Sequence, residues 1–384
     1  MKPILNTHYD IAVCGGGFAG IAAALAAARE GKKVILFEKE YLLGGLGTAG
    51  LVTIYLPLCD GCGHQVSFGI AEELLRLSIT YGAEAMYPGN WLDSDGPRGA
   101  EHHRFMVQYN PHLFAILAEQ KLTEEGVDIL YGSYVVDTEV EDGRITALHV
   151  ENKSGRTAYR IRSVVDATGD ADVAHFAGAP TATFGRGNVL AGWYYYTNAD
   201  GYKLQLLGAA DNFQGPITGE RFTGLDGVEI SDMVRKSHDF TLRHYLARRE
   251  QDPAAVLSTI SSIPQLRMTR RIVGEYEMTE ADDHVRFEDS VGMVGNWKQR
   301  GPVYEIPYRA LYSGQMRNLI TAGRCVSTDD VLWDAMRVIP CCAVTGQAAG
   351  TAAALTDDFT ALDVGALQSV LRERGVRLHI DEVM

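Results

Sequence analysis

The sequence predicts an α/β protein, and three stretches of the chain support this prediction. Residues 9–38 alternate as an apolar strand, an Ala-rich helix and a second apolar strand. Residues 127–152 alternate polar and apolar side chains on both sides of Asp142-Gly143, which is typical of a β-hairpin. Residues 318–355 begin with an apolar strand and continue into an Ala/Gly-rich helix. Strands that alternate with helices in this way favour a layered fold with a parallel sheet.

The first strand and helix meet at a turn rich in glycine. YDIAVC (9–14) is apolar and β-branched enough to be a buried strand, and FAGIAAALAAARE (18–30) is composed of strong helix formers. Gly31 follows where a helix is expected to end, and KVILFE (33–38) is the second strand. The pattern Gly15-x-Gly17-x-x-Gly20 therefore lies between a strand and a helix, which is the context that a dinucleotide-binding turn requires.

Glycine is needed at each position of this pattern for a separate physical reason. Gly15 permits the tight turn, Gly17 lets a pyrophosphate approach the backbone, and Gly20 lets the helix pack closely on the strand. The helix N-terminus offers unpaired N–H groups and positive potential to the phosphates. Glu38 ends the second strand, where an acidic side chain can bind a ribose hydroxyl. The ligand predicted here carries an ADP moiety, and this turn alone leaves open whether it is NAD or FAD.

The remaining elements follow in chain order from the same rules. Glycines recur too often in LLGGLGTAGLV for a helix, so this stretch is expected to hold backbone close to a ligand. A Gly-, Pro- and Asp-rich loop is expected at 82–101, and the middle of the chain, 180–315, is rich in strands and aromatic residues. Helices are expected at 70–77, 112–126, 231–250, 341–355 and 363–374, and further strands after Ser154-Gly155, at 163–169 and at 318–324.

Composition limits the classes of function. The chain has 384 residues, 46% hydrophobic and 22% charged, which is ordinary for a globular protein of two domains. Its net charge of −14 argues against nucleic acid and anionic membranes as partners. No apolar run reaches the roughly 18 residues that span a bilayer, and MKPILNTHYD lacks signal-peptide features, so a cytoplasmic protein is expected. Its six cysteines are then not expected to form structural disulfides.

The chain resembles the FAD-dependent oxidoreductases of the FAD_oxidored type, which include the flavin part of heterodisulfide-reductase A-like proteins. The matching stretches extend from the first strand to the last core helix: CGGGFAGIAAALAAAREG, LLGGLGTAGLV, YLPLCDGCG, VVDATGDADVAHFAGAP, MTRRIVGEY, ITAGRCVS and RVIPCCAVTGQAAGTAAAL. The resemblance implies a Rossmann-like, three-layer ββα FAD-binding domain of the glutathione-reductase type. A mostly β substrate or cap domain would be inserted in it. The implied FAD-binding domain comprises 1–55, 108–178 and 316–384, and the implied cap comprises 56–107 and 179–315.

By resemblance, FAD is bound non-covalently along these matched stretches. Gly323-Arg324 stands where many related flavoproteins have Gly-Asp on the ribityl chain. Pro340 suits the first turn of a helix whose N–H groups would face the flavin pyrimidine edge. Gly346 and Gly350 lie four residues apart on that helix, where close packing against the cofactor or the first strand is expected. The implied cofactor contacts are Gly15, Gly17, Phe18, Ala19, Gly20, Glu38, Lys39, Gly44, Gly45, Leu46, Thr48, Val135, Thr168, Gly169, Asp170, Gly323, Arg324, Arg337, Cys341 and Gly346.

The cysteines offer one redox candidate. Cys59-x-x-Cys62 has the spacing of a dithiol that could exchange electrons with flavin or substrate, although a plain loop toward the substrate pocket is the alternative. Adjacent cysteines such as Cys341 and Cys342 rarely pair, so core packing is expected of them. No group of four has the spacing of an iron–sulfur site, and no metal site is predicted.

Three further candidates for chemistry lie in the predicted cap. Tyr194 and Tyr196 share one face of an extended strand, so either a substrate-pocket phenol or a packed sheet face is expected. His103 lies in a polar loop and is either a catalytic group or a solvated histidine. Arg270 and Arg271 point to opposite faces, so that one could bind a substrate carboxylate, and Arg271 is taken as the candidate.

Arg337 is the strongest polar candidate because it directly precedes the expected flavin helix in RVIP. A guanidinium there could bind the flavin pyrimidine edge, an anionic substrate or a neighbouring carboxylate such as Asp334. Asp330 stands where some relatives have histidine and could serve as the general base.

The predicted function is hydride transfer between a small organic substrate and flavin N5. A flavoprotein electron-transfer subunit of a redox complex, resembling heterodisulfide reductase, is the alternative. An RNA-modifying flavoprotein is disfavoured by the net charge of −14. The sequence leaves open the substrate, the electron acceptor and whether the chain forms a homo-oligomer.

Overall fold

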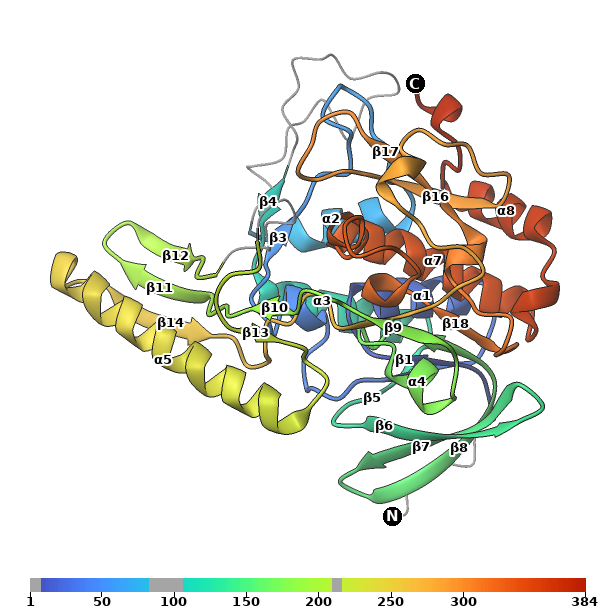
Figure 1. The fold of residues 1–384 in the computed structure, drawn as a ribbon, viewed down its shortest axis with the longest axis horizontal. Coiled ribbons are helices and arrows are strands. Elements are labelled where there is room, and N and C mark those ends of the chain that lie inside the picture. Colours follow the sequence, from blue (N-terminus) through green and yellow to red (C-terminus); the bar gives the residue numbers. More distant parts are fainter. Residues whose placement is uncertain (1–7, 83–105, 209–215) are drawn as a thin grey trace.

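A computed structural model describes residues 8–82, 106–208 and 216–384. Its centre is a seven-stranded sheet in the order β5-β2-β1-β8-β7-β6, with β18 pairing β8 (Figure 1). Strands β1 (Tyr9–Cys14), β2 (Val34–Phe37), β5 (Asp128–Leu130) and β18 (Leu319–Thr321) run parallel to one another and to the end of β8. The predicted α/β class with a parallel sheet is therefore confirmed.

Side chains of β1 alternate between two cores, which defines the three layers. Ile11 and Val13 face one core, together with helices α1 (Phe18–Arg29) and α7 (Ile339–Leu355). Ala12 and Cys14 face the other core, which the antiparallel strands cover from the opposite side. Helices, parallel sheet and antiparallel strands thus form the predicted ββα layers.

Strand β8 (Gly155–Asp166) connects two of these layers. Its first half pairs antiparallel with β7 (Arg144–Asn152), and its second half pairs parallel with β1. The sequence predicted two separate strands for this stretch, but the chain continues through both as one strand. The predicted hairpin between β6 (Tyr134–Glu141) and β7 turns at Asp142 and Gly143, whose φ angles of 49° and 69° are left-handed.

Helices α1 and α7 pack closely because their interface is made of small residues. A Cβ on Gly346 would lie 2.2 Å from the carbonyl oxygen of Ala19, and one on Gly350 would lie 2.1 Å from that of Ala23. The two glycines therefore contact helix α1. The prediction that they pack on the cofactor or the first strand was wrong, because the atoms nearest to both glycines belong to α1.

The layers described above form the body of the molecule, and the following helices and short strands also belong to it. On the helical side are α2 (Ile70–Ile79), α3 (Pro111–Glu124) and α8 (Val364–Glu373), whose bounds agree with the predicted helices to within a few residues. The short elements are β3 (Ile54–Tyr55), β4 (Val107–Gln108), α4 (Asp172–Phe176), β9 (Thr181–Thr183), β10 (Asn188–Val189), β13 (Arg221–Phe222), β15 (Arg270–Ile272), β16 (Ser290–Gly295), β17 (Val303–Pro307) and α6 (Trp333–Met336).

One group of elements projects from the body, and we call it the projecting module (Figure 1). It consists of the sheet β12-β11-β14 and the long helix α5, with β11 (Tyr194–Asn198), β12 (Gly201–Gln205), β14 (Val256–Ile260) and α5 (Gly227–Gln251). Tyr194 and Tyr196 of β11 form a small core of their own with side chains of α5. The module contributes only to small cores among the described residues, and the body contains both large ones.

Candidate functional site: a dinucleotide cavity at the edge of the sheet

A cavity of about 400 Å³ crosses the carboxyl edge of the parallel sheet. It is lined by the loops that follow β1, β2, β5, β8 and β18, and by the first turn of α7. The carboxyl edge is where α/β sheets bind ligands. Because β2 and β18 lie on opposite sides of β1 and β8, the cavity has one end at the β2 loop and the other at α7. We call these the β2 end and the α7 end.

The glycine turn forms the middle of the cavity wall. Gly15 has a φ of +101°, and a Cβ there would lie 2.5 Å from the carbonyl oxygen of Ala167, so only glycine fits. A Cβ on Gly20 would lie 1.8 Å from the oxygen of Gly15, which explains the close approach of helix and turn. A Cβ on Gly17 would meet no atom within 4 Å. Gly17 therefore faces open space at the N-terminus of α1, as a pyrophosphate site requires.

The second glycine loop lies directly against the first. Gly44 donates its N–H to the oxygen of Gly16 over 2.8 Å, and it has a φ of +100°. Gly44, Gly45 and Leu46 line the cavity as predicted. Thr48 does not, because its side chain is buried and its hydroxyl donates to the oxygen of Leu43. Thr48, which the resemblance placed among the cofactor contacts, is therefore not part of the cavity lining.

Glu38 marks the β2 end of the cavity. Its carboxylate accepts the N–H of Gly16 at 2.6 Å and that of Glu40 at 2.8 Å. Burial raises the pKa of Glu38, while these two backbone donors act in the opposite direction. Lys39 and Val135 line the same end. A carboxylate held in this way keeps further acceptor positions for ribose hydroxyls.

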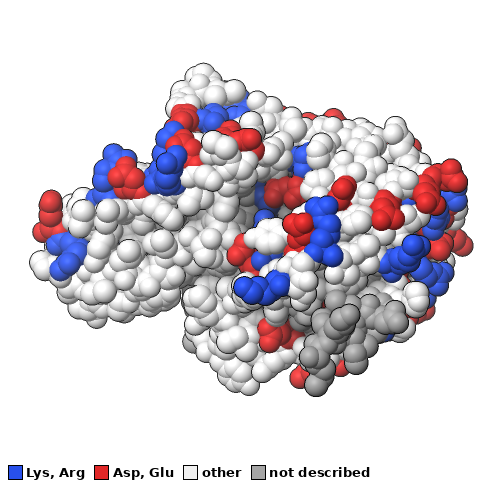
Figure 2. All heavy atoms as spheres, turned by 90° about the horizontal axis from the view of Figure 1, so that it is seen from below, with Lys and Arg blue, Asp and Glu red and all other residues white. Residues whose placement is uncertain are grey.

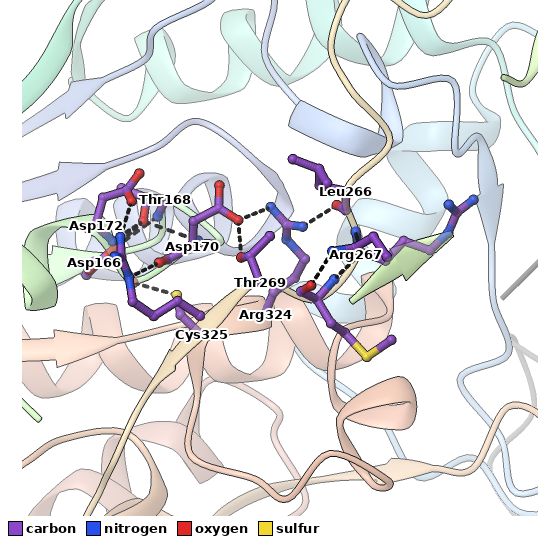
Figure 3. Close-up of polar contacts among 12 residues, drawn as sticks. Asp166, Thr168, Asp170, Asp172, Leu266, Arg267, Thr269, Arg324 and Cys325 are labelled. Atoms are coloured by element: carbon purple, nitrogen blue, oxygen red, sulfur yellow. Dashed lines mark hydrogen bonds and ion pairs between the residues drawn. The ribbon is translucent and has the colours of Figure 1, made fainter. Parts of the chain in front are cut away.

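A polar network connects the turn after β8 to the cavity wall (Figure 3). Asp170 accepts the hydroxyl of Thr269 at 2.5 Å and the guanidinium of Arg324 at 3.1 Å. Arg324 also donates to the carbonyl oxygen of Leu266. Thr168, Gly169, Asp170, Gly323 and Arg324 all line the cavity, as the resemblance implied. The guanidinium of Arg324 bridges Asp170 and the segment 263–266.

The α7 end is formed by the first turn of that helix. Its first N–H groups have no partner inside the helix, and proline stands in its first turn as predicted. Ile339, Cys342 and Arg337 line the cavity here. The thiol of Cys341 is instead buried against Met336, so the prediction of Cys341 as a cofactor contact has to be moved by one residue. Burial raises the pKa of Cys342 to about 12, so its thiol stays protonated at neutral pH.

Arg337 is held by an acidic neighbour. Its guanidinium donates to one oxygen of Asp334 through both Nη2 and Nε, the Nε distance being 3.0 Å, and Lys298 reaches the other oxygen of Asp334 at 2.5 Å. Burial alone would raise the pKa of Asp334, but Arg337 and Lys298 hold it below its ordinary value. Of the alternatives that the sequence offered for Arg337, the structure contains the ion pair and also places the residue at the cavity.

Four other predicted catalytic residues lie away from this cavity. The phenol of Tyr194 hydrogen-bonds to His244 at 3.0 Å inside the projecting module. Asp330 accepts the N–H of Gly185 at 2.9 Å, and Arg271 pairs with Glu277 at 2.6 Å. Cys59 is buried in the core that also contains α1 and α7. In each case tertiary packing places the side chain outside the lining of this cavity, and its catalytic role stays a prediction.

The remaining candidates are His103, Arg270 and the cysteines. His103 lies outside the described residues. Arg270 pairs with Asp172 at 2.6 Å, next to the cavity. All six cysteines are described and none forms a disulfide; Cys62 is exposed and Cys59 is buried. Within the described part of the chain, no group of three or more His, Cys, Asp or Glu could hold a metal ion.

Several residues of the wall had no sequence signal of their own. Ile263, Pro264 and Leu266 come from the segment before β15 and close one side of the cavity. Cys342 is the exception, because it directly follows Cys341, the residue that the sequence analysis placed at the cofactor. Ser133, directly before β6, and Tyr134, its first residue, line the β2 end. Such residues enter the site through long-range packing, which short-range patterns do not report.

The glycine cradle fits FAD on the geometry of these residues alone. Open space at Gly17, the unpaired N–H groups of α1 and the carboxylate of Glu38 suit an ADP moiety, and a second helix N-terminus lies at the far end. Together these features define a flavoprotein of the FAD-binding Rossmann class.

A family comparison then identifies the chain. Residues 10–191 and 225–371 match the family described as FAD dependent oxidoreductase. This match covers most of the 384 residues, so the chain belongs to that family and FAD is its cofactor. The resemblance inferred from the sequence is confirmed.

Curated relatives share only parts of the chain. Thioredoxin reductase of Ureaplasma parvum is 34% identical over 77 residues, which is 20% of this chain and 25% of the relative. Thiamine thiazole synthase of Desulfosudis oleivorans is 50% identical over 44 residues, which is 12% of this chain and 17% of the relative. The chain thus matches no more than a quarter of the length of these relatives.

Solved structures confirm the fold. A geranylgeranyl bacteriochlorophyll reductase-like protein from Thermoplasma acidophilum has a TM-score of 0.50 at 14% identity, over 96% of this chain and 84% of its own. A triple mutant of the flavin-dependent brominase Bmp2 has a TM-score of 0.51 at 12% identity, over 95% and 84%.

The described surface shows two further properties. No helix in the described ranges is long and apolar enough to cross a membrane. On the face in Figure 2, Lys and Arg lie interspersed with Asp and Glu, and they form no continuous basic area of the kind that binds nucleic acid.

Proposed function

We propose that this FAD-dependent oxidoreductase transfers a hydride between a small organic substrate and N5 of the flavin. The observation that supports it best is the α7 end of the cavity. There a helix N-terminus, Arg337 and the apolar wall of Ile263 and Leu266 surround one space. When bound, FAD supplies the redox chemistry through its isoalloxazine ring.

The protein residues at the α7 end would bind and orient. The N–H groups at the start of α7 favour negative charge at the nearby edge of a ligand. Arg337 is held in place by Asp334 and presents its guanidinium to the same space. The side chains of Ile263 and Leu266 exclude water from it. We assign to these residues positioning and charge stabilisation.

The proposal includes a division of the chain. Residues 1–55, 108–178 and 316–384 would hold the cofactor, and 56–107 and 179–315 would form the substrate side. The wall segment 263–266 belongs to the second group and contacts the first through Arg324. Substrate would then bind where the two groups meet.

The electron-transfer alternative has less support from the described residues. It expects a redox cysteine beside the flavin, and Cys342 is the cysteine at the α7 end. Because its pKa is raised to about 12, little of it is thiolate at neutral pH. Cys59 and Cys62 lie away from the cavity lining.

Anaerobic reduction of the purified holoenzyme tests the proposal. Pools of small alcohols, amines and acids are added in turn, and loss of the flavin absorbance identifies a reducing substrate. That substrate is then labelled with deuterium at the carbon that loses hydrogen, and reduction should become slower by a primary isotope effect. Reduction that shows no isotope effect, or that occurs only with dithiols or carrier proteins, would favour the electron-transfer alternative.

A further inference from the structure

Arg267 is a buried cation with an unpaired nitrogen, next to the α7 end of the cavity. Its side chain is only 6% exposed, and its Nη2 has no hydrogen-bond partner. Nη1 donates to the carbonyl oxygen of Gln265 at 3.2 Å, and the guanidinium lies 5.2 Å from the ring centre of Trp193. An uncompensated guanidinium in such surroundings is costly to bury, so a stabilising partner is expected.

The position of Arg267 is firmly fixed. The side-chain oxygen of Asn188 accepts the N–H of Arg267 at 2.8 Å and that of Met268 at 3.0 Å. The preceding residue, Leu266, lines the cavity and accepts a hydrogen bond from Arg324. The backbone therefore fixes the start of this buried side chain, which extends away from Arg324 (Figure 3).

Positive charge exceeds negative charge around this residue. Arg337 and Lys298 share the carboxylate of Asp334, and Arg324 uses that of Asp170. No carboxylate lies within ion-pair distance of Arg267 in the described part of the chain. Burial and the charges of Arg337 and Arg324 lower the pKa of Arg267 to about 9, against the opposing effect of Asp334. The group nevertheless remains charged at neutral pH.

We infer that Arg267, together with Arg337, binds an anionic group of the substrate, most simply a carboxylate. This inference rests on the proposed function and names the class of its substrate: a small organic acid. A carboxylate would supply the missing acceptor for Nη2 of Arg267 and would balance the excess positive charge. Planar guanidinium groups suit carboxylates because their donors match both oxygens.

The cofactor is a second source of negative charge, and the experiment has to separate the two. The pyrophosphate is expected at Gly17 and α1, where backbone N–H groups serve it. If Arg267 instead stabilised FAD, removing its charge would weaken FAD binding. If it binds substrate, the same change would weaken the binding of simple anions and leave FAD in place.

The test is an anion titration of the holoenzyme, followed through the flavin absorbance spectrum. Benzoate, malonate, acetate and inorganic phosphate are the probes, and chloride at equal ionic strength is the control. The variants are Arg267→Met, which removes the charge at similar length, and Arg267→Lys, which keeps the charge but not the planar donors. Arg309→Met is the matched control, because Arg309 also lies over an aromatic ring but pairs with Asp289.

In the wild type and in Arg309→Met, at least one carboxylate probe should perturb the spectrum with a measurable dissociation constant. Arg267→Met should raise that constant about tenfold or more, as expected for the loss of a charge-assisted hydrogen bond, and Arg267→Lys should fall between. FAD content should stay unchanged, and the melting temperature should not fall, because an uncompensated buried charge has been removed.

Three results would overturn the inference. One is a wild type in which no anion perturbs the flavin; another is an unchanged anion affinity in Arg267→Met. The third is a partial loss of FAD from that variant while the holoenzyme that remains binds anions like the wild type, which would assign the charge to the cofactor. Because the titration needs no turnover, a failure here is distinguishable from a failure of hydride transfer, which the isotope experiment measures.

Discussion

The cavity and the projecting module are built in contrasting ways. The middle of the cavity is made of backbone: Gly15, Gly17 and Gly44 shape it through their conformation and lack of side chains. The module is held together by side chains, such as Tyr194 with His244, and Tyr195 stacked on Tyr202 at 4.4 Å. Changes to the first region should therefore act through backbone space, and changes to the second through packing and single hydrogen bonds.

The largest effect is expected from Gly17→Val. Gly17 has a φ of −70°, which valine can adopt, and a Cβ there would meet nothing within 4 Å. The protein should therefore fold, but its new side chain would occupy the space of the pyrophosphate. Purified Gly17→Val should contain no flavin, and it should show near-native far-UV circular dichroism.

Gly20→Val is the matched comparison within the same turn. Its Cβ would lie 1.8 Å from the oxygen of Gly15, so the helix has to shift from the strand. We expect a loss of stability of about 3 kcal/mol or more from overpacking, measured by urea unfolding. If Gly17→Val is the variant that unfolds and Gly20→Val the one that keeps its stability, the assignment of the two glycines is reversed.

Backbone features of this kind could be predicted from the sequence. The glycine turn, the hairpin at Asp142-Gly143 and the bounds of α1 and α7 follow from rules that operate over a few residues. Most of the predicted cofactor residues accordingly lie at the cavity. These rules state which backbone conformations a residue permits, and they need no knowledge of distant segments.

Side-chain placement was predicted less well, for a physical reason. Tyr194, Asp330 and Arg271 found partners more than five residues away in sequence or in another element. Arg267 gave no signal, because its burial depends on Asn188 and Trp193. The continuity of β8 was missed since it depends on pairing with two different strands.

Arg337→Lys should have the next largest effect, on activity rather than on folding. Lysine keeps the charge but loses the planar donors that now contact Asp334. We expect a loss of roughly 1–3 kcal/mol in transition-state stabilisation, measured as kcat/KM once a substrate is known. FAD content and melting temperature should stay near those of the wild type. Early melting with normal turnover of the remaining holoenzyme would make Arg337 a structural residue.

Tyr194→Phe should have a smaller effect, confined to the projecting module. The change removes the hydrogen bond to His244 and keeps the ring in its core. Stability should fall by about 0.5–1.5 kcal/mol, while kcat and KM should be unchanged because the phenol lies away from the cavity lining. A large fall in kcat with normal stability would restore the substrate role that the sequence first suggested for this residue.

The last effect is expected at Asp172 on the cavity edge, and it depends on pH. Burial, and after it the charges of Asp170 and Asp166, raise its pKa from 3.8 to about 6, while Arg270 acts in the opposite direction. The folded protein therefore holds the proton more tightly than the unfolded chain does. As pH rises from about 4 to about 6, the unfolded chain gives up this proton first, so folding stability falls across that window and then levels off.

Asp172→Asn removes this titration and isolates it from other groups. The melting temperature of the cofactor-free variant, relative to that of the wild type, should rise with pH across the same window and stay constant above it. A difference of opposite sign would mean that Arg270 dominates, through its ion pair at 2.6 Å, and that the edge of the cavity stabilises the charged carboxylate.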